Sequence, residues 1–168
     1  MVNAKSCIGV LLAMILPVSM IAGTQHPADQ QHNHRQAGVD ERGDHTMGFS
    51  HEKTTHHFRL SARGGSIEVT ANDSKDSASV EQIRKHLSHI VKMFKEGNFE
   101  APILIRGETP PGVPTMKKLK GEIDYTFEKI DQGGRVRIAT ANAEAIESIH
   151  EFLRYQIKDH RTGDPLEP

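Results

Sequence analysis

Two segments of the chain repeat one another, and this repeat constrains the fold more than any other feature of the sequence. GGSIEVTAN (64–72) and GGRVRIATAN (133–142) each begin with two glycines, continue with alternating apolar and polar residues, and end in Asn. Such alternation is typical of a strand buried on one face only. Each copy follows another alternating segment, 54–61 or 122–130, and the glycine pair at the junction predicts a turn. The chain is therefore expected to contain two β-hairpins.

An amphipathic helix is expected after each hairpin. Ser79 and Gln82 have the spacing of a capping box, so a helix is predicted to begin there and to end at Gly97. Asn142 is predicted to cap a second helix over residues 143–158. The apolar residues recur at helical spacing in both: Val80, Ile83, Leu87, Ile90, Val91 and Phe94 in the first, and Ile146, Ile149, Leu153 and Ile157 in the second. Two such ββα units predict an α+β fold, a four-stranded, mainly antiparallel sheet with both helices on one face.

Alternation also assigns the strand residues to the two faces of the sheet. The face toward the helices is expected to carry the apolar side chains and His56, and the opposite face is expected to be charged. Residues on that open face include Glu122, Asp124, Glu128, Arg135 and Arg137, whose charges can pair across strands. Between the two units, residues 103–105 predict a short strand, and the proline-rich loop 107–115 leads into a short helix over 115–120.

The N-terminal part of the chain has the features of an export signal followed by a tether. Lys5 precedes an apolar run over residues 8–16, which is shorter than the roughly 20 residues of a membrane span, so residues 1–23 are predicted to be a signal peptide. Residues 24–53 contain few apolar residues and five histidines, which predicts a disordered, His-rich tether. The α+β domain is expected over residues 54–164 of a periplasmic or secreted protein, with no membrane span after signal removal.

Composition excludes several classes of function. The single cysteine, Cys7, lies within the predicted signal, so the mature chain is expected to have no disulfide and no thiolate site. A net charge of −1 gives no basic surface for nucleic acid. The sequence has no G-x-S-x-G elbow and no phosphate-binding glycine loop, which leaves a small hydrolase as the weakest alternative. The unusual feature is the presence of eleven histidines.

The stretch HLSHIVKMF (86–94) is the strongest candidate for a functional site. Its helical spacing places His86, His89 and Met93 along one side of the first helix. Imidazole and thioether groups bind copper, and imidazole alone also suits zinc or nickel. His56, on its strand, and His150, at the edge of the second helix's apolar stripe, are the candidates to complete the site. The sequence thus predicts an exported domain that binds a transition metal, with copper as the first choice.

Two other interpretations remain open. Histidines near an apolar face are commonly boundary residues satisfied by hydrogen bonds, and a methionine there commonly fills the core. In that case the protein is a metal-free interaction module, and its charged open sheet face docks a protein partner or a second copy. Substitution of His86 and His89 separates the two readings, because only a metal protein would lose affinity while keeping its fold.

From residue 47 onward the chain resembles a family of small exported bacterial proteins. The matching segments are MGF (47–49), KTTHHF (53–58), HLSHIVKMF (86–94), PPGVP (110–114) and FLRYQI-x-x-H-x-TGD (152–164). Some members carry the label aspartate carbamoyltransferase. This chain lacks that enzyme's S-T-R-T-type carbamoyl-phosphate loop and is too short for its two domains. The resemblance therefore implies an exported domain and no reaction.

Overall fold

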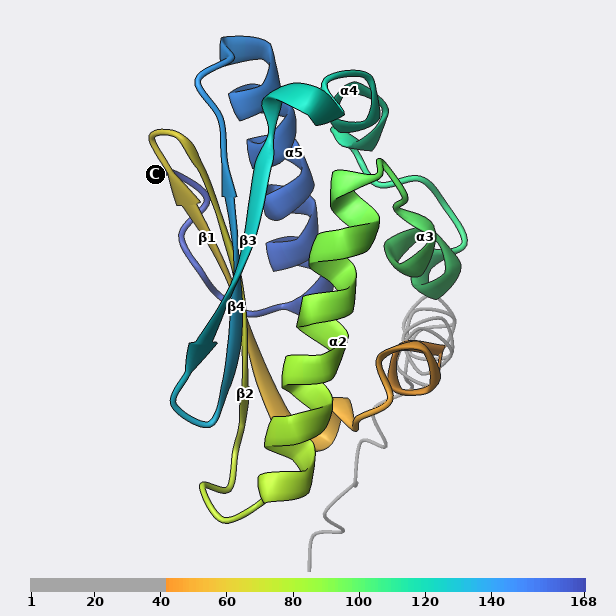
Figure 1. Ribbon diagram of the computed structural model, residues 1–168, viewed down its shortest axis with the longest axis vertical. Coiled ribbons are helices and arrows are strands. Elements are labelled where there is room, and N and C mark those ends of the chain that lie inside the picture. The colour runs from red at the N-terminus through yellow and green to blue at the C-terminus, as the bar shows by residue number, and fades with distance from the viewer. Residues whose placement is uncertain (1–41) are drawn as a thin grey trace, which may run out of the picture.

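The two predicted hairpins form one four-stranded antiparallel sheet in the computed structural model, which describes residues 42–168 (Figure 1). The strands are β1 (Thr54–Ser61), β2 (Gly64–Ala71), β3 (Asp124–Ile130) and β4 (Gly133–Ala139), in the order β1-β2-β4-β3. The repeated segments are thus the two central strands. They pair with Ile67 opposite Val136, residues at equivalent positions of the repeat, so an approximate two-fold axis relates the hairpins. The predicted α+β fold is confirmed.

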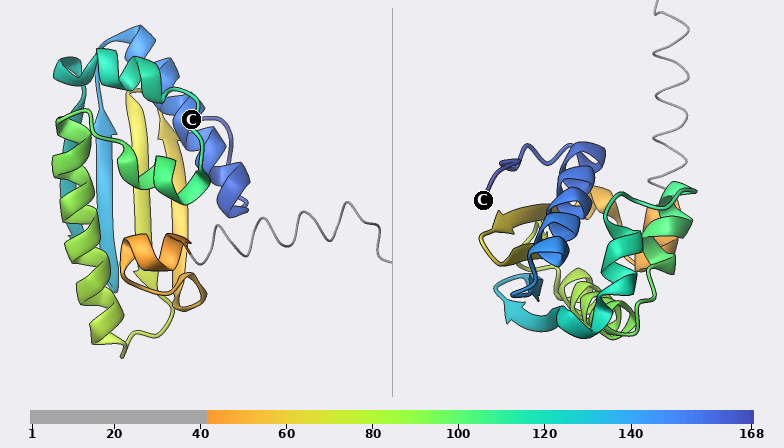
Figure 2. Two further views of the ribbon diagram at one scale, coloured as in Figure 1. Left: turned by 90° about the vertical axis from the view of Figure 1, so that its right-hand side faces the viewer. Right: turned by 90° about the horizontal axis from the view of Figure 1, so that it is seen from above.

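Two long helices, α2 (Ser77–Lys95) and α5 (Ala143–His160), lie on the apolar face of the sheet (Figure 2). Their apolar residues are buried as the spacing predicts, with Ile83, Ile149 and Leu153 fully covered. α2 packs chiefly on β3 and β4, whereas α5 packs on β1 and β2. Each helix therefore covers the hairpin of the other ββα unit, which ties the two units into a single core.

Two of the four predicted helix ends hold. Asn142 caps α5 by accepting from the Ala145 N–H. α2 ends before Gly97, which takes the left-handed conformation, whereas α5 runs to His160, two residues past its predicted end. The predicted capping box at Ser79 is wrong, because α2 begins two residues earlier. There the Asp76 carboxylate accepts from both the backbone N–H and the hydroxyl of Ser79, and it is the better N-cap.

The glycine pairs do not form the hairpin turns, which is a second correction. The turns are residues 62–63 and 131–132, and each glycine pair begins the following strand. A Cβ atom on Gly64 would lie 2.2 Å from the Ile138 carbonyl oxygen, and one on Gly133 would lie 1.9 Å from that of Val69. The glycines are required because β2 and β4 approach each other closely at both ends of their pairing.

The predicted strand over residues 103–105 is also wrong, since these residues belong to helix α3 (Glu100–Arg106). A three-residue apolar run does not distinguish a strand from one face of a helix. Ala101 is buried and Ile103 packs against the core, while Leu104 is 63% exposed. The short helix predicted after the proline-rich loop is present as α4 (Val113–Lys118), followed by the 3-10 turn η2 (Lys120–Glu122).

Ordered structure begins before the predicted domain boundary at residue 54. Residues 42–47 are helical, Ser50 caps the 3-10 turn η1 (His51–Lys53), and Phe49 is buried in the core. The expected disordered tether is therefore wrong for residues 42–53, because Met47 and Phe49 supply the apolar contacts that the surrounding polar residues lack. Residues 24–41 of the tether and the predicted signal peptide lie outside the described residues. Within residues 42–168, no helix has the length and apolar character needed to cross a membrane.

Candidate functional site

A cavity of about 350 Å³ lies between the sheet and the helices, beside the start of β1. The helical segment 42–47, β1, β2, α2, α3 and α5 all contribute to its wall. Much of the wall is apolar and comes from the core side of these elements. The polar residues of the wall are His51, Thr54, Thr55, His56, His57, His86, Arg106, Gln156, His160 and Thr162.

His56 lies on the core side of β1, as alternation predicts. Its ring stacks between those of Phe49, at 6.2 Å, and His160, at 5.1 Å between centroids. Burial, with smaller contributions from the charges of His86 and Arg106, lowers the pKa of His56 to about 4. The imidazole is therefore neutral at pH 7. Its ring nitrogens make no hydrogen bond to any residue in the described part of the chain.

His86 faces the same cavity from α2. Its ring meets the Phe49 ring edge-on, with the centroids 5.6 Å apart. Burial, followed by the charge of His89, lowers the pKa of His86 to about 4. Like His56, it forms no hydrogen bond to residues 42–168. Each neutral imidazole presents one donor and one acceptor, so the two rings together offer four polar positions.

His160 closes the cavity at the end of α5, where it contacts the rings of His56 and Phe58. Its Nε2 lies 2.7 Å from Nη2 of Arg106. A guanidinium can only donate, so Nε2 accepts and the ring proton is on Nδ1. Burial and the charges of His56 and Arg106 hold the pKa of His160 well below its usual value. Arg106 also forms an ion pair with Asp159 on α5.

Gln156 is the third polar group of the cavity without a partner. It lies one turn before His160 on α5, and its side chain is 5% exposed. Its Nε2 is buried and has no hydrogen-bond acceptor among residues 42–168. A buried donor without a partner costs about 1 to 3 kcal/mol, which a ligand with an acceptor in this position would recover.

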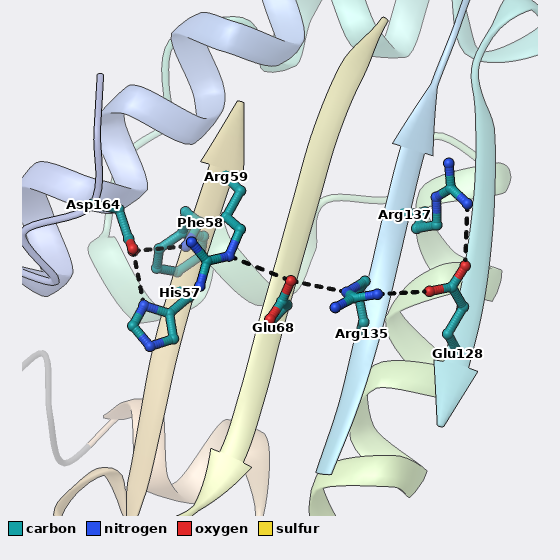
Figure 3. Close-up of polar contacts among 8 residues, drawn as sticks. All are labelled: His57, Phe58, Arg59, Glu68, Glu128, Arg135, Arg137 and Asp164. Atoms are coloured by element: carbon teal, nitrogen blue, oxygen red, sulfur yellow. Dashed lines mark hydrogen bonds and ion pairs between the residues drawn. The ribbon is translucent and has the colours of Figure 1, made fainter. Parts of the chain in front are cut away.

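The C-terminal tail fastens this end of the molecule from the other side of β1. Asp164 accepts hydrogen bonds from His57 Nδ1, at 2.9 Å, and from the Phe58 backbone N–H, at 3.0 Å (Figure 3). Burial alone would raise the pKa of Asp164, but the hydrogen bonds from Thr162, Phe58 and His57 outweigh it and lower the pKa. The tail thus fixes β1 next to α5 and holds His160 against His56.

The structure brings together two of the five residues predicted from sequence. His56 and His86 line the cavity, whereas Met93 packs against the core outside its wall and His89 is exposed. His150 is buried elsewhere, and its Nε2 donates to the carbonyl oxygens of Ser61, at 3.0 Å, and Gly64, at 3.1 Å. His150 therefore anchors the β1–β2 turn to α5, the hydrogen-bonded role that the alternative reading allowed. Across residues 42–168, no three His, Cys, Asp or Glu side chains are placed to hold a metal ion.

Sequence reasoning did not find the residues that α5 and α3 supply to the cavity. Phe152, Gln156 and His160 are spaced four residues apart, which places them on one face of α5 beside the apolar stripe. That spacing was the signal available for Gln156 and His160. Arg106 had no such signal, because its position depends on α3, which the sequence did not reveal as a helix.

Segments that are far apart in the sequence, and that carry the resemblance described above, meet at this site. MGF supplies Phe49, KTTHHF supplies His56, and the stretch beginning at residue 86 supplies His86, while the last segment supplies His160 and Asp164. Comparisons of the chain with protein-family models, with curated proteins and with solved structures found no match. The functional argument therefore depends on the chemistry of the cavity.

Proposed function

We propose that the protein is an exported binding protein that holds a small neutral molecule in the cavity beside β1. The observation that supports this is the convergence of unpartnered polar groups. The imidazoles of His56 and His86 and the amide of Gln156 all face one cavity and make no hydrogen bond to residues 42–168. Leaving the buried Nε2 of Gln156 without an acceptor is costly, and a bound ligand that pairs with it repays that cost.

Charge and shape define the class of ligand. Burial keeps His56, His86 and His160 neutral at pH 7, and the charge of Arg106 is paired with that of Asp159. An ion entering this cavity would lose its hydration without gaining an opposite charge, so a neutral molecule is favoured. The rings of His56 and Phe58 in the cavity wall favour a flat ring system in the ligand. Gln156 adds a requirement for one acceptor, such as a carbonyl oxygen.

A transition-metal ion is the second candidate, with copper first and zinc or nickel as alternatives. Metal binding is favoured because burial keeps His56 and His86 in the neutral form that coordinates metals. The ligand set would be these two residues, because His89, Met93 and His150 do not line the cavity. A wall with two neutral imidazoles and no unpaired carboxylate suits monovalent copper better than a divalent ion.

A thermal-unfolding screen of the full chain tests both candidates. The panel contains neutral ring compounds that carry a carbonyl group, together with Cu(I), Zn²⁺ and Ni²⁺ added separately. A ligand at a hundredfold excess over its dissociation constant adds about 2.7 kcal/mol to the unfolding free energy. We expect a saturable shift with one or more of the ring compounds.

Three variants locate the binding. Gln156→Leu removes the unpaired donor, so the free protein should be at least as stable as wild type while the ligand-induced shift is reduced. His86→Gln should also reduce the shift, whereas His89→Gln, at an exposed position of the same helix, should leave it unchanged. A shift with copper alone would select the second candidate. No shift with any compound, or a shift that Gln156→Leu and His86→Gln both leave intact, would refute binding in this cavity.

A further inference from the structure

The open face of the sheet carries charged side chains arranged in rows across the strands. One row consists of His57, Glu68, Arg135 and Glu128, which pair in register from β1 to β3. Its charges are satisfied within the row, since Arg135 lies 2.8 Å from Glu68 and 3.2 Å from Glu128 (Figure 3). This row offers no surplus charge to a partner.

The next row toward the β1–β2 turn is different. In register it contains Arg59, Ser66, Arg137 and Thr126, and so it has two cations and no carboxylate. Both arginines reach back to the first row, Arg59 to Glu68 at 3.5 Å and Arg137 to Glu128 at 3.4 Å. Their side chains remain 52% and 62% exposed, whereas those of Glu68 and Glu128 are 13% and 32% exposed. The accessible charge at this end of the face is therefore positive.

A shallow groove of about 520 Å³ follows this cationic row. Small side chains, those of Ser61, Ser66 and Ala139, line it, which leaves the surface hollow between the longer arginines. Arg63, in the hairpin turn, adds an exposed cation that forms no ion pair with the described residues. Glu68 is the only carboxylate among the described residues of the groove, and it is already shared between Arg59 and Arg135.

We propose that this groove binds an acidic segment of a protein partner in an extended conformation. Arg59 and Arg137 stand on strands two apart, which is about 10 Å at the usual strand spacing. Side chains on one face of an extended peptide recur every two residues, at about 6.6 Å, and the length of the arginine side chains spans the remaining difference. The hydroxyl of Ser66, in register between the two arginines, supplies a further donor for a carboxylate oxygen. A nucleic acid fits less well, because the chain as a whole has a net charge of −1 and the cationic surface is one short row.

Fluorescence anisotropy of the full chain with a fluorescein-labelled hexaglutamate peptide tests this proposal. At low salt we expect saturable binding that weakens as salt increases. Arg63→Glu and Arg137→Glu should each weaken binding at least tenfold. Lys92→Glu, which makes the same change of charge at an exposed position of α2, should leave it unchanged within twofold. Circular dichroism should show that the variants are folded, because neither arginine is buried.

The proposal is overturned if hexaglutamate does not bind, or if the two arginine variants bind it as well as wild type and Lys92→Glu do. It is equally overturned if a labelled DNA duplex binds this face and the peptide does not. The result is independent of the cavity, which lies on the other side of the sheet and which these substitutions do not touch.

Discussion

Acidification from pH 7 to pH 5 should destabilise the protein through the histidines of the cavity. The pKa values of His56 and His86 are lowered from 6.5 to about 4 in the folded state. Between pH 6.5 and pH 4 these histidines are protonated in the unfolded chain but not in the folded chain, so stability falls as the pH falls. The loss begins near pH 6.5 and levels off below about pH 4, where both states are protonated.

The size of the effect follows from the pKa shifts. A pKa unit corresponds to about 1.4 kcal/mol, so each histidine can contribute about 3 kcal/mol over the whole range. Between pH 7 and pH 5 the linkage relation gives about 2 kcal/mol for each, or about 4 kcal/mol for the pair. That is a large part of the roughly 5 to 15 kcal/mol that stabilises a typical domain. His160 acts in the same direction, because its pKa is also lowered.

Urea denaturation at pH 7, 6 and 5 measures this loss, with extrapolation of the unfolding free energy to zero urea. His86→Gln removes one titrating group, so its loss between pH 7 and pH 5 should be smaller than that of wild type by about 2 kcal/mol. His89→Gln is the matched control, since this exposed residue lies one turn further along α2. An equal loss in wild type and His86→Gln would refute the claim that burial in the cavity keeps His86 neutral.

Three further substitutions test the fold around the site. Gly133→Ala should prevent stable folding, because its methyl group would lie 1.9 Å from the Val69 carbonyl oxygen. Gly121→Ala is the control, since its methyl group would have no atom within 4 Å, and circular dichroism melts should show no change in its stability. Asn142→Ala should cost about 1 kcal/mol in urea denaturation through loss of the α5 cap, and an unchanged midpoint would contradict that role. Asp164→Asn should cost about 1 to 3 kcal/mol at pH 7, and this cost should shrink as the pH falls through the lowered pKa of the wild-type carboxylate.

Much of the fold was predictable because its signals are local. The period-two pattern of the strands and the period-3.6 pattern of α2 and α5 identified every major element, and the repeat identified the pairing of two hairpins. The errors concern features that depend on tertiary contacts. Gly64 and Gly133 are glycines because another strand lies against them, which no local turn rule reveals. α3 is a short helix whose buried face depends on the core beneath it.

The candidate site was less predictable for the same reason. Spacing along α2 grouped His86 with His89 and Met93, but the cavity draws its residues across elements, from β1, α2 and the end of α5. His160 reaches His56 because α5 packs on β1, and the tail reinforces this contact where Asp164 bonds to His57 and Phe58. A contact between residues more than 100 positions apart in the sequence cannot be predicted from periodic residue spacing. His150 shows the converse, since a histidine at the edge of an apolar stripe serves as a structural hydrogen-bond donor.

The most direct test of ligand binding is a crystal structure of the full chain with the compound that stabilises it most in the thermal screen. The account predicts that the ligand lies in the cavity between β1 and α5, with an acceptor atom within hydrogen-bond distance of Gln156 Nε2. It also predicts that the ligand pairs with the ring nitrogens of His56 or His86. A ligand bound elsewhere, or a cavity closed by the protein's own side chains, would contradict the account.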